Sequence, residues 1–291
     1  MIGDNLIDRV RAFANSSGSA EGVSATPLPC LTVLRSHAPT SLKAVLYNPL
    51  LCLILQGSKE TVVGTHKLYF EAGESLIVSH DVPVFSRIID ASAEKPYLAL
   101  VISLDMQIVR SLYDEVGEAV LDAAQSRALH VGETEEALVN AASRLFDLVH
   151  RPDEAGVLMP LILREIHFRV LLAKHGVMLR QLLRRESHAS RLAKVIAHIK
   201  TDFAAPYSVS ELASIAGMST SSFHEHFKAL TATTPLQYLK NMRLIEARRL
   251  LMDKGFTVAS AAFQVGYESP TQFSREYARK FGAAPSLDKA V

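Results

Sequence analysis

The chain has 291 residues, of which 48% are hydrophobic and 21% charged, so packed domains are expected and long disordered segments are not. Lys and Arg number 31 against 30 Asp and Glu, and no apolar run reaches the roughly 18 residues needed to cross a bilayer. The N-terminal residues lack a signal-peptide profile, and two cysteines are too few for a disulfide framework or a four-cysteine zinc site, so we expect a cytoplasmic protein without a membrane partner.

Residues 1–28 are expected to form a short helix and then a loop rich in Ser and Gly, NSSGSAEGVSATPLP. From 29 to 104, short apolar runs such as LLCLILQ, SLIVS and YLALVIS alternate with turn signals at Gly57, Gly64 and Gly73. Short strands separated by turns at this spacing predict a β-barrel or a β-sandwich.

Residues 105–186 have apolar side chains at three- and four-residue spacing, which predicts helices. Pro160 is well placed to open one of them. A helical block so rich in Leu, Ile and Val can connect two domains, and it can also bury one face against a second copy of itself. We therefore expect a linker segment that makes a homodimer.

The region 187–291 is predicted to be all helical and is more basic than the rest of the chain. From His188 onwards it holds 13 Lys and Arg against 8 Asp and Glu, a net charge of +5, whereas the preceding residues sum to −4. A basic C-terminal segment on a slightly acidic body suggests an anionic partner for that segment.

This region contains an internal repeat. The first copy, residues 209–230, reads VSELASIAGMSTSSFHEHFKAL, and the second, residues 258–281, reads VASAAFQVGYESPTQFSREYARKF. Gly217 and Gly266 occupy matching positions 49 residues apart, and matching aromatic residues follow each of them. A short helix, a glycine turn and a second helix anchored by aromatic side chains predict a helix-turn-helix motif in each copy.

The second helix of such a motif enters the major groove of DNA with its outward face. If the aromatic residues point inward, helical periodicity places a set of polar side chains outward. Arg can form two hydrogen bonds with a guanine edge, and Gln can do the same with adenine. Glu can accept a hydrogen bond from the amino group of cytosine, and Lys can bind a backbone phosphate. The candidate DNA-contacting residues are Ser221, Ser222, His224, Glu225 and Lys228 in the first copy, and Thr271, Gln272, Ser274 and Arg275 in the second.

A helix predicted from Pro235 to about Lys254 joins the two motifs. Twenty residues at about 1.5 Å each span roughly 30 Å, close to the ~34–36 Å between successive major-groove faces. One monomer could thus place both motifs on one side of a duplex. Lys240, Arg243, Arg248 and Arg249 on this helix are expected to be phosphate contacts or solvated charges.

Residues 193–285 resemble the DNA-binding domain of AraC-family transcriptional regulators, in ELASIAGMSTSSFHEHFKAL and in ASAAFQVGYESPTQFSREYARKFGAAP. The β-rich region, with LCLILQG and GTHKLYFEAGESLIVSHDVPV, is similar to the N-terminal domain of one branch of that family. The resemblance implies a cupin-like effector domain, a helical dimerisation segment and a bipartite DNA reader. It places the base-contacting helices at 221–228 and 270–279, which adds Arg279 to the candidates. Glu225 departs from the family pattern, which commonly has a basic or bulky polar residue at this position. The short tail SLDKAV also departs from the pattern, because it lacks the usual basic ending.

A cupin-like barrel also raises the question of a metal enzyme. The β region contains only His37, His66 and His80, widely spaced, whereas metal-binding cupins use a His-x-His pair followed by Glu and a further His. The one His-x-His pair, His224 and His226, lies on a predicted helix, where residues two apart face different sides. We therefore predict no metal, no cofactor and no catalytic residues.

A ligand pocket is the better-supported use of the barrel, because eight-stranded barrels can hold one small molecule. The candidate pocket residues are Cys30, Cys52 and His80, although Cys52 in LLCLILQ has the pattern of a buried, inert thiol.

The sequence thus predicts an α+β multidomain protein with a cupin-like jelly-roll barrel, a helical linker and an all-α domain with two helix-turn-helix motifs. We interpret it as a nucleoid-associated transcription regulator, an activator that binds double-stranded DNA and a small-molecule effector, with RNA polymerase as a further expected partner. Two alternatives stay open: an effector-independent regulator whose barrel serves dimerisation only, and a cupin-type enzyme with a DNA-binding tail.

Overall fold

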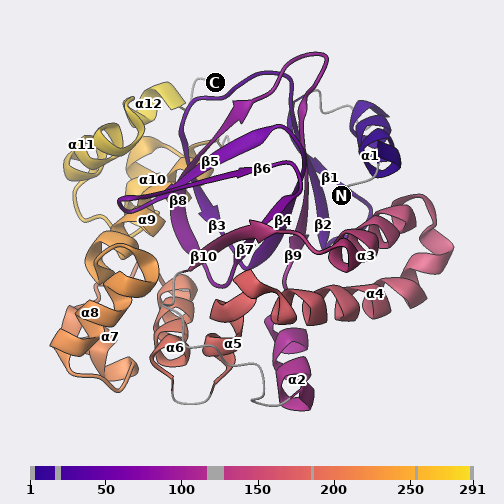
Figure 1. The fold of residues 1–291 in the computed structure, drawn as a ribbon. Helices are drawn as coiled ribbons and strands as arrows, with labels where there is room; N and C mark the ends of the chain where they lie inside the picture. Colours follow the sequence, from indigo (N-terminus) through magenta and orange to yellow (C-terminus); the bar gives the residue numbers. More distant parts are fainter. Residues whose placement is uncertain (1–3, 17–20, 117–127, 185–186, 253–254, 289–291) are drawn as a thin grey trace.

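The computed structural model describes residues 4–16, 21–116, 128–184, 187–252 and 255–288 (Figure 1). Part of the predicted N-terminal loop, at 17–20, and the last three residues of the C-terminal tail lie outside the described residues. None of the helices in these ranges is long and apolar enough to cross a membrane.

The N-terminal half is built around two antiparallel β-sheets. One sheet has the strand order β1-β2-β9-β4-β7-β10 and the other β3-β8-β5-β6. Apolar side chains from both sheets meet between them, among them Ile54, Phe70, Val84 and Tyr97. The α+β fold class is therefore confirmed, with two sheets facing one another, an arrangement compatible with a jelly roll, rather than a closed barrel. The strands are β1 (Gly22–Ala25), β2 (Leu31–Ser36), β3 (Lys43–Tyr47), β4 (Leu50–Gln56), β5 (Ser58–Val63), β6 (His66–Glu71), β7 (Glu74–Val78), β8 (Val82–Asp90), β9 (Tyr97–Ser103) and β10 (Leu129–Glu133).

Two strands lie where the sequence predicts none. β1 falls within the predicted N-terminal loop and pairs with β2 at the edge of the larger sheet. β10 interrupts the segment predicted to be helical and pairs with β7, with Leu129 opposite Val78. Both strands are only four or five residues long, and they form because a neighbouring strand offers unpaired backbone groups, which local periodicity does not reveal.

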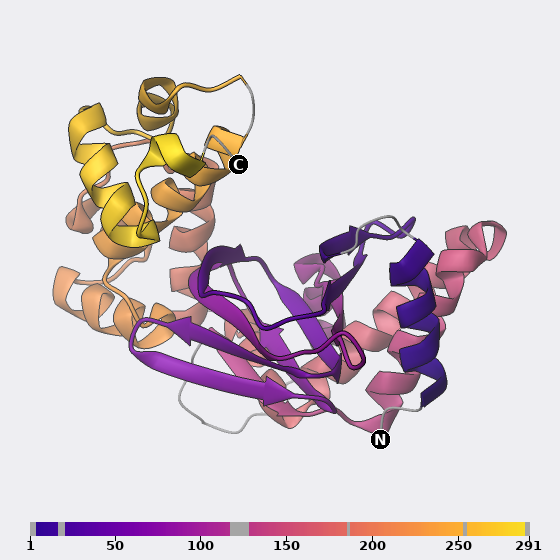
Figure 2. The same ribbon diagram turned by 90° about the horizontal axis from the view of Figure 1, so that it is seen from above.

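Helices cover the outer face of the six-stranded sheet and form a second apolar core with it, which includes Val10, Phe146, Ile166 and Val170. In both views this helical layer, with α1 and α3, lies on the side of the sandwich away from the last helices of the chain (Figures 1 and 2). The helices of the layer are α1 (Asp4–Ser16), α2 (Met106–Val116), α3 (Glu136–Asp147), α4 (Pro152–Leu172) and α5 (Val177–Leu183).

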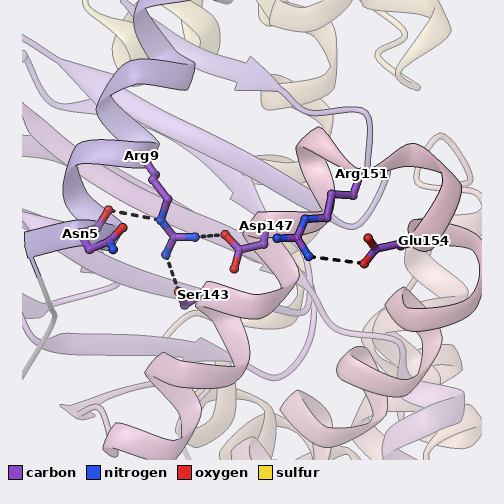
Figure 3. Close-up of polar contacts among 6 residues, drawn as sticks. All are labelled: Asn5, Arg9, Ser143, Asp147, Arg151 and Glu154. Atoms are coloured by element: carbon purple, nitrogen blue, oxygen red, sulfur yellow. Dashed lines mark hydrogen bonds and ion pairs between the residues drawn. The ribbon is translucent and has the colours of Figure 1, made fainter.

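Arg9 ties α1 to α3 (Figure 3). Its guanidinium donates to the Ser143 hydroxyl at 2.6 Å and to the Asn5 carbonyl at 3.3 Å, and it forms an ion pair with Asp147. The N-terminal helix is thereby held on the layer that covers the sheet.

The C-terminal region is all helical and contains two small cores. One core surrounds Phe223, Phe227 and Tyr238, and the other surrounds Phe273 and Tyr277. The long helix α9 contributes residues to both cores, and so joins two similar halves. The helices are α6 (His188–Thr201), α7 (Val209–Ile215), α8 (Thr220–Thr231), α9 (Pro235–Met252), α10 (Val258–Gln264), α11 (Pro270–Phe281) and α12 (Pro285–Asp288).

Candidate nucleic-acid interface

The pair α7 and α8 forms the first helix-turn-helix unit. A capping box starts α7, in which the Ser208 side chain accepts from the Glu211 backbone and the Glu211 side chain accepts from the Ser208 backbone. Gly217 has φ +61° in the turn between the helices. The Ser219 hydroxyl then caps α8 by accepting from the Ser222 backbone at 3.3 Å. Each step is a local signal that the sequence carries.

The pair α10 and α11 repeats this arrangement. Thr257 caps α10 with Ser260, Gly266 has φ +83° in the turn, and the Ser269 hydroxyl caps α11. Pro270 occupies the first turn of α11, where its missing N–H costs nothing. The duplicated pattern therefore corresponds to two folded units of the same design.

On α8 the aromatic residues Phe223 and Phe227 are fully buried, together with Leu230. The opposite side of α8 is polar and faces away from the protein. Four of the five candidate residues of this helix are exposed and one, Ser222, is partly exposed; the set is Ser221, Ser222, His224, Glu225 and Lys228.

On α11 the buried anchors are Phe273 and Tyr277, while Phe281 is partly exposed. Four of the five candidate residues of this helix are exposed and one, Ser274, is partly exposed; the exposed set is Thr271, Gln272, Arg275 and Arg279. A hollow of about 460 Å³ lies beside this face, bordered by Ser269, Thr271, Gln272, Arg275, Glu276 and Arg279. The face therefore offers both hydrogen-bond donors and acceptors beside a concave surface.

Glu276 stabilises the base of that face. Its carboxylate forms an ion pair with Lys240 at 2.6 Å and accepts from the Tyr267 hydroxyl at 2.8 Å. Burial raises the pKa of Glu276, but the hydrogen bonds from Lys240 and Tyr267 outweigh it and leave the pKa below its usual value. The carboxylate is therefore occupied within the protein and does not stand free to repel a phosphate.

The helix α9 spans 18 residues, or about 27 Å at 1.5 Å per residue. The sequence-based expectation for its charges is wrong for Arg243. The Arg243 guanidinium donates to four backbone carbonyls, those of Phe203 at 2.7 Å, Ala204 at 3.1 Å, Ala205 at 2.8 Å and Gly266 at 3.2 Å. We call this cluster the α9 junction. It joins the segment that leads into the first motif to the turn of the second.

The other cations of α9 have partners within the protein as well. Lys240 pairs with Glu276, Arg248 with Asp288 at 3.0 Å, and Arg249 with Glu246 at 2.6 Å. Each of these ion pairs occupies a cation of the linker helix with a carboxylate of the same chain. The exposed residues of α8 and α11 are left as the side chains most available to DNA.

His226 on α8 is turned towards the protein. Its ring lies 3.8 Å from the ring of His188 at the start of α6, measured between centroids. His224, two residues earlier, is exposed on a different face of the helix. Among the described residues, no group of three or more His, Cys, Asp or Glu side chains could hold a metal ion.

The three candidate pocket residues do not share one site. Cys30 packs against the helical layer, and burial raises the pKa of its thiol. Cys52 lies between the two sheets, where burial raises its pKa as well. His80 is buried in the turn between β7 and β8, where burial lowers its pKa to about 4.

The N-terminal sandwich touches the helical domain next to that turn. Lys200 of α6 pairs with Asp81 at 2.7 Å, and the Tyr238 hydroxyl of α9 donates to the Asp81 carbonyl at 2.6 Å. The Ala128 backbone N–H donates to the Leu230 carbonyl at the end of α8, at 3.1 Å. The sequence gives no sign of these contacts, because the partners of Asp81 are 119 and 157 residues away.

Two family models match the chain. The model for the AraC-type transcriptional regulator N-terminus matches residues 27–178, and a helix-turn-helix domain model matches residues 212–288. The first match alone covers more than half of the 291 residues. The two matches are consecutive and do not overlap.

Several curated relatives match parts of the chain. It is 32% identical over 101 residues to the transcriptional regulator CdhR of Pseudomonas aeruginosa (35% of this chain, 30% of CdhR). It is 34% identical over 100 residues to the transcriptional activator RhaS of Escherichia fergusonii (34% of this chain, 36% of RhaS). The match to the thermoregulatory protein LcrF of Yersinia pestis is 24% over 178 residues (60% and 64%). The chain thus spans about a third of the length of CdhR and of RhaS.

Among solved structures, ToxT of Vibrio cholerae has the same fold over nearly the whole chain. An apo form of a ToxT variant aligns with a TM-score of 0.61 at 12% identity, covering 91% of this chain and 99% of ToxT. The fatty-acid-bound wild-type ToxT aligns with a TM-score of 0.56 at 12% identity, covering 89% and 94%. With the match to the N-terminal family model and the two helix-turn-helix units described above, the chain belongs to the AraC family of transcriptional regulators.

Proposed function

We propose that this protein is a sequence-specific DNA-binding transcription regulator that reads two adjacent major-groove segments with α8 and α11. The observation that carries the proposal is the pair of helix-turn-helix units, each of which buries its aromatic anchors and exposes a polar face. The membership in the AraC family supports it. The likeness to the transcriptional activator RhaS favours activation over repression.

Arg275 is the proposed base-reading residue of α11. We expect Arg275→Ala to weaken binding to the specific site by about 1–3 kcal/mol, because a bidentate contact to guanine is lost. Binding to unrelated DNA should change little. Titration of fluorescent duplexes carrying the specific site or a scrambled site measures both quantities, after footprinting upstream of neighbouring genes has located the site.

Lys228→Ala is the matched control on α8. Lys228 is exposed and is proposed to contact a phosphate, so its loss should weaken binding to both duplexes equally and reduce the salt dependence by about one charge. If Arg275→Ala behaves in the same way as Lys228→Ala, then Arg275 contacts only the backbone.

We further propose that a small-molecule effector at the N-terminal sandwich controls DNA binding. The structural support is the set of contacts between the sandwich and the helical domain, which reach α6, α9 and the C-terminal end of α8. The ToxT structure with a bound fatty acid supports ligand binding by a protein of this fold. Ligand binding would shift the population between a restrained and a released arrangement of the two reading helices.

Gly64 tests this restraint. It lies at the tip of the β5–β6 hairpin with φ +57°, and a Cβ atom there would lie 2.3 Å from the carbonyl oxygen of Ala232, directly after α8. Gly64→Ala should push the hairpin away from α8. We expect a three- to tenfold gain in DNA affinity of the effector-free protein, a shift of about 0.7–1.4 kcal/mol.

Gly73→Ala is the control for backbone strain. Gly73 has φ +96°, but nothing lies within 4 Å of a Cβ placed there. The variant therefore suffers a comparable local strain without contact to the helical domain. An unchanged affinity in Gly64→Ala, or an equal gain in Gly73→Ala, would contradict the proposed restraint and favour an effector-independent regulator.

We also propose that the protein forms a homodimer through α4. The buried face of α4 includes Ile162, Ile166 and Val170, and the opposite face has an exposed apolar stripe. Arg164 and Glu165 flank the stripe near its middle, and each is already ion-paired within the chain. An antiparallel pair of α4 helices would place these oppositely charged groups beside one another across a two-fold axis. The stripe consists of the exposed Val157, Leu161 and Leu172 and the partly buried Phe168, which also packs against the core of the helical layer.

Leu161→Glu is expected to weaken dimerisation at least about a hundredfold, because it replaces up to ~3 kcal/mol of apolar burial with two charges near the axis. Leu161 is 61% exposed, so the monomer itself should fold normally. Sedimentation equilibrium measures the dissociation constant. Leu287→Glu, at an equally exposed leucine on α12, is the control that should leave it unchanged. A wild-type protein that stays monomeric would sink the proposal.

A further inference from the structure

The interior of the sandwich contains polar groups in an otherwise apolar core. The Tyr47 hydroxyl of β3 donates to the Ser86 hydroxyl of β8 at 3.0 Å, and the Thr61 hydroxyl of β5 lies 3.1 Å from that of Ser86. Ser86 in turn donates to the Glu60 carbonyl at 3.2 Å. These hydroxyls satisfy one another, so they form a fixed polar wall on the inner face of the smaller sheet.

Lys59 is on the same inner face. Side chains alternate along β5, and Thr61 and Val63, two and four residues further on, are both buried in the interior. Glu60 points to the outer face, where it pairs with Arg87 at 2.8 Å. The Lys59 ammonium lies 5.5 Å from the centre of the Tyr47 ring, within the range of a cation–π contact.

The larger sheet places two more groups in this space. Cys52 of β4 and Tyr97 of β9 are buried in the same interior core, at 4% and 0% exposure. The Tyr97 hydroxyl has the Cys52 thiol beside it and no other hydrogen-bond partner in the described part of the chain. A buried phenol without a strong acceptor or donor is uncommon in folded proteins, and it points to a missing partner.

Lys59 has no counter-ion among the described residues. No carboxylate there forms an ion pair with it, and its neighbour Glu60 is occupied by Arg87. Burial lowers the pKa of Lys59, but the nearby Tyr47 hydroxyl and Cys52 thiol outweigh it and raise the pKa overall, so the amine stays protonated. An ammonium that is partly withdrawn from water without an anion beside it loses hydration that no ion pair replaces.

We propose that the sandwich interior binds a small monocarboxylate, whose carboxylate pairs with the Lys59 ammonium and accepts from the Tyr97 hydroxyl. The apolar body of such a ligand would pack against core side chains of both sheets, such as Ile54 and Phe70. Lys59 is itself only partly buried, which leaves an approach from solvent. That this ligand is the effector rests on the proposed function, but its binding does not.

The same strands offer a route from this site to the helical domain. Tyr47 and Ser86 face the interior, and their sequence neighbours Leu46 and Phe85 face the helices. Leu46 packs against the core that contains Phe223, and Phe85 lies under the Lys280 ammonium of α11, 4.6 Å from it. A ligand that displaces β3 or β8 would therefore move residues in direct contact with the DNA-binding helices.

The test is thermal unfolding of the full chain with a panel of small acids: butyrate, hexanoate, benzoate and phenylacetate, each beside its uncharged amide. At least one acid should raise the melting temperature by about 3 °C or more at a saturating concentration, and its amide should not. The apparent affinity for that acid, taken from how the melting-temperature shift depends on acid concentration, should be at least tenfold weaker in Lys59→Met.

The ligand-free melting temperature of Lys59→Met provides a second readout. Removing a partly buried charge that has no counter-ion should leave this melting temperature unchanged or raise it, whereas removing a lysine needed for packing would lower it. Tyr97→Phe keeps the ring and removes the hydroxyl, so it should weaken the acid response without preventing folding. Lys280→Met, which alters a basic hollow between sandwich and helices, is the control that should respond as the wild type does.

Two results would overturn the proposal. The first is that no acid in the panel shifts the melting temperature more than the same concentration of chloride does. The second is that Lys59→Met and Tyr97→Phe both respond to the acid as the wild type does. The proposed function is tested separately, by measuring how tightly the ligand-free protein binds the specific and the scrambled DNA duplex. A failed acid response with intact specific DNA binding would reject only the carboxylate site.

Discussion

Gly266→Ala should destabilise the helical domain by about 3–5 kcal/mol, because two independent costs coincide at this position. The backbone has φ +83°, in the left-handed region that an L side chain enters at a cost of roughly 1–2 kcal/mol. A Cβ atom would also lie 2.3 Å from the Ala204 carbonyl oxygen and 2.8 Å from its Cα. Both are backbone atoms, which cannot rotate out of the way as a side chain can.

Gly217→Ala is the matched control, since it occupies the same place in the first motif. Its φ is +61°, but the nearest atom to a Cβ at this position would be 3.9 Å away, at the tip of Arg191. Only the left-handed strain remains, so we expect a loss of about 1–2 kcal/mol. Peptide-resolved hydrogen exchange of α6–α11 in the full chain measures both variants. Equal losses would show that the contact with Ala204 is unimportant.

Arg243→Met should cost about 3 kcal/mol or more. The change keeps the aliphatic stem of the side chain and removes the guanidinium, so four backbone carbonyls lose a charged donor at once. Burial lowers the pKa of Arg243, yet an arginine remains charged, and removing a partly buried charged donor that bonds several carbonyls is among the expensive single changes. Urea denaturation and hydrogen exchange of the same helices report the loss.

Arg243→Lys and Arg249→Met complete this experiment. A lysine ammonium is a point donor that cannot span carbonyls from two segments, so Arg243→Lys should recover less than half of the lost stability. Arg249 has a largely exposed side chain, and its ion pair with Glu246 lies within α9 itself, so Arg249→Met should change stability by less than about 0.5 kcal/mol. A similar loss in Arg249→Met would mean that charge on α9, and not the junction, is responsible.

The two sites are also expected to be coupled. Gly266 and Ala204 both provide carbonyls to Arg243, and the Cβ of Gly266→Ala would displace Ala204. In the double variant the total loss should therefore be smaller than the sum of the two single losses, by about 0.5–3 kcal/mol.

Local signals explain why the reading helices could be predicted from the sequence. Phe223, Phe227, Phe273 and Tyr277 recur at helical spacing, and each turn carries a glycine with an N-cap residue soon after it. These features act over about ten residues, so pattern and structure coincide. The same reasoning identified most strands of the sandwich.

Features that depend on distant partners could not be predicted. Arg243 has sequence surroundings like those of the other cations on α9, and its role depends on carbonyls 38 to 40 residues before it and 23 after it. In the sequence, Lys59 looks like an ordinary charged residue of a strand. Only the pairing register of β5 with β6 and β8 places it on the face that points between the two sheets. Strand β10 exists because the edge of β7 is open to it.

The α9 junction has a consequence for the operators this protein can use. Because one guanidinium fastens both motifs to the same helix, the angle between the two recognition helices is built into the polypeptide. Each base pair inserted between the two half-sites advances the second by about 3.4 Å and rotates it by roughly 34° around the duplex. Operator half-sites should therefore tolerate base substitutions far better than a change of spacing by a single base pair.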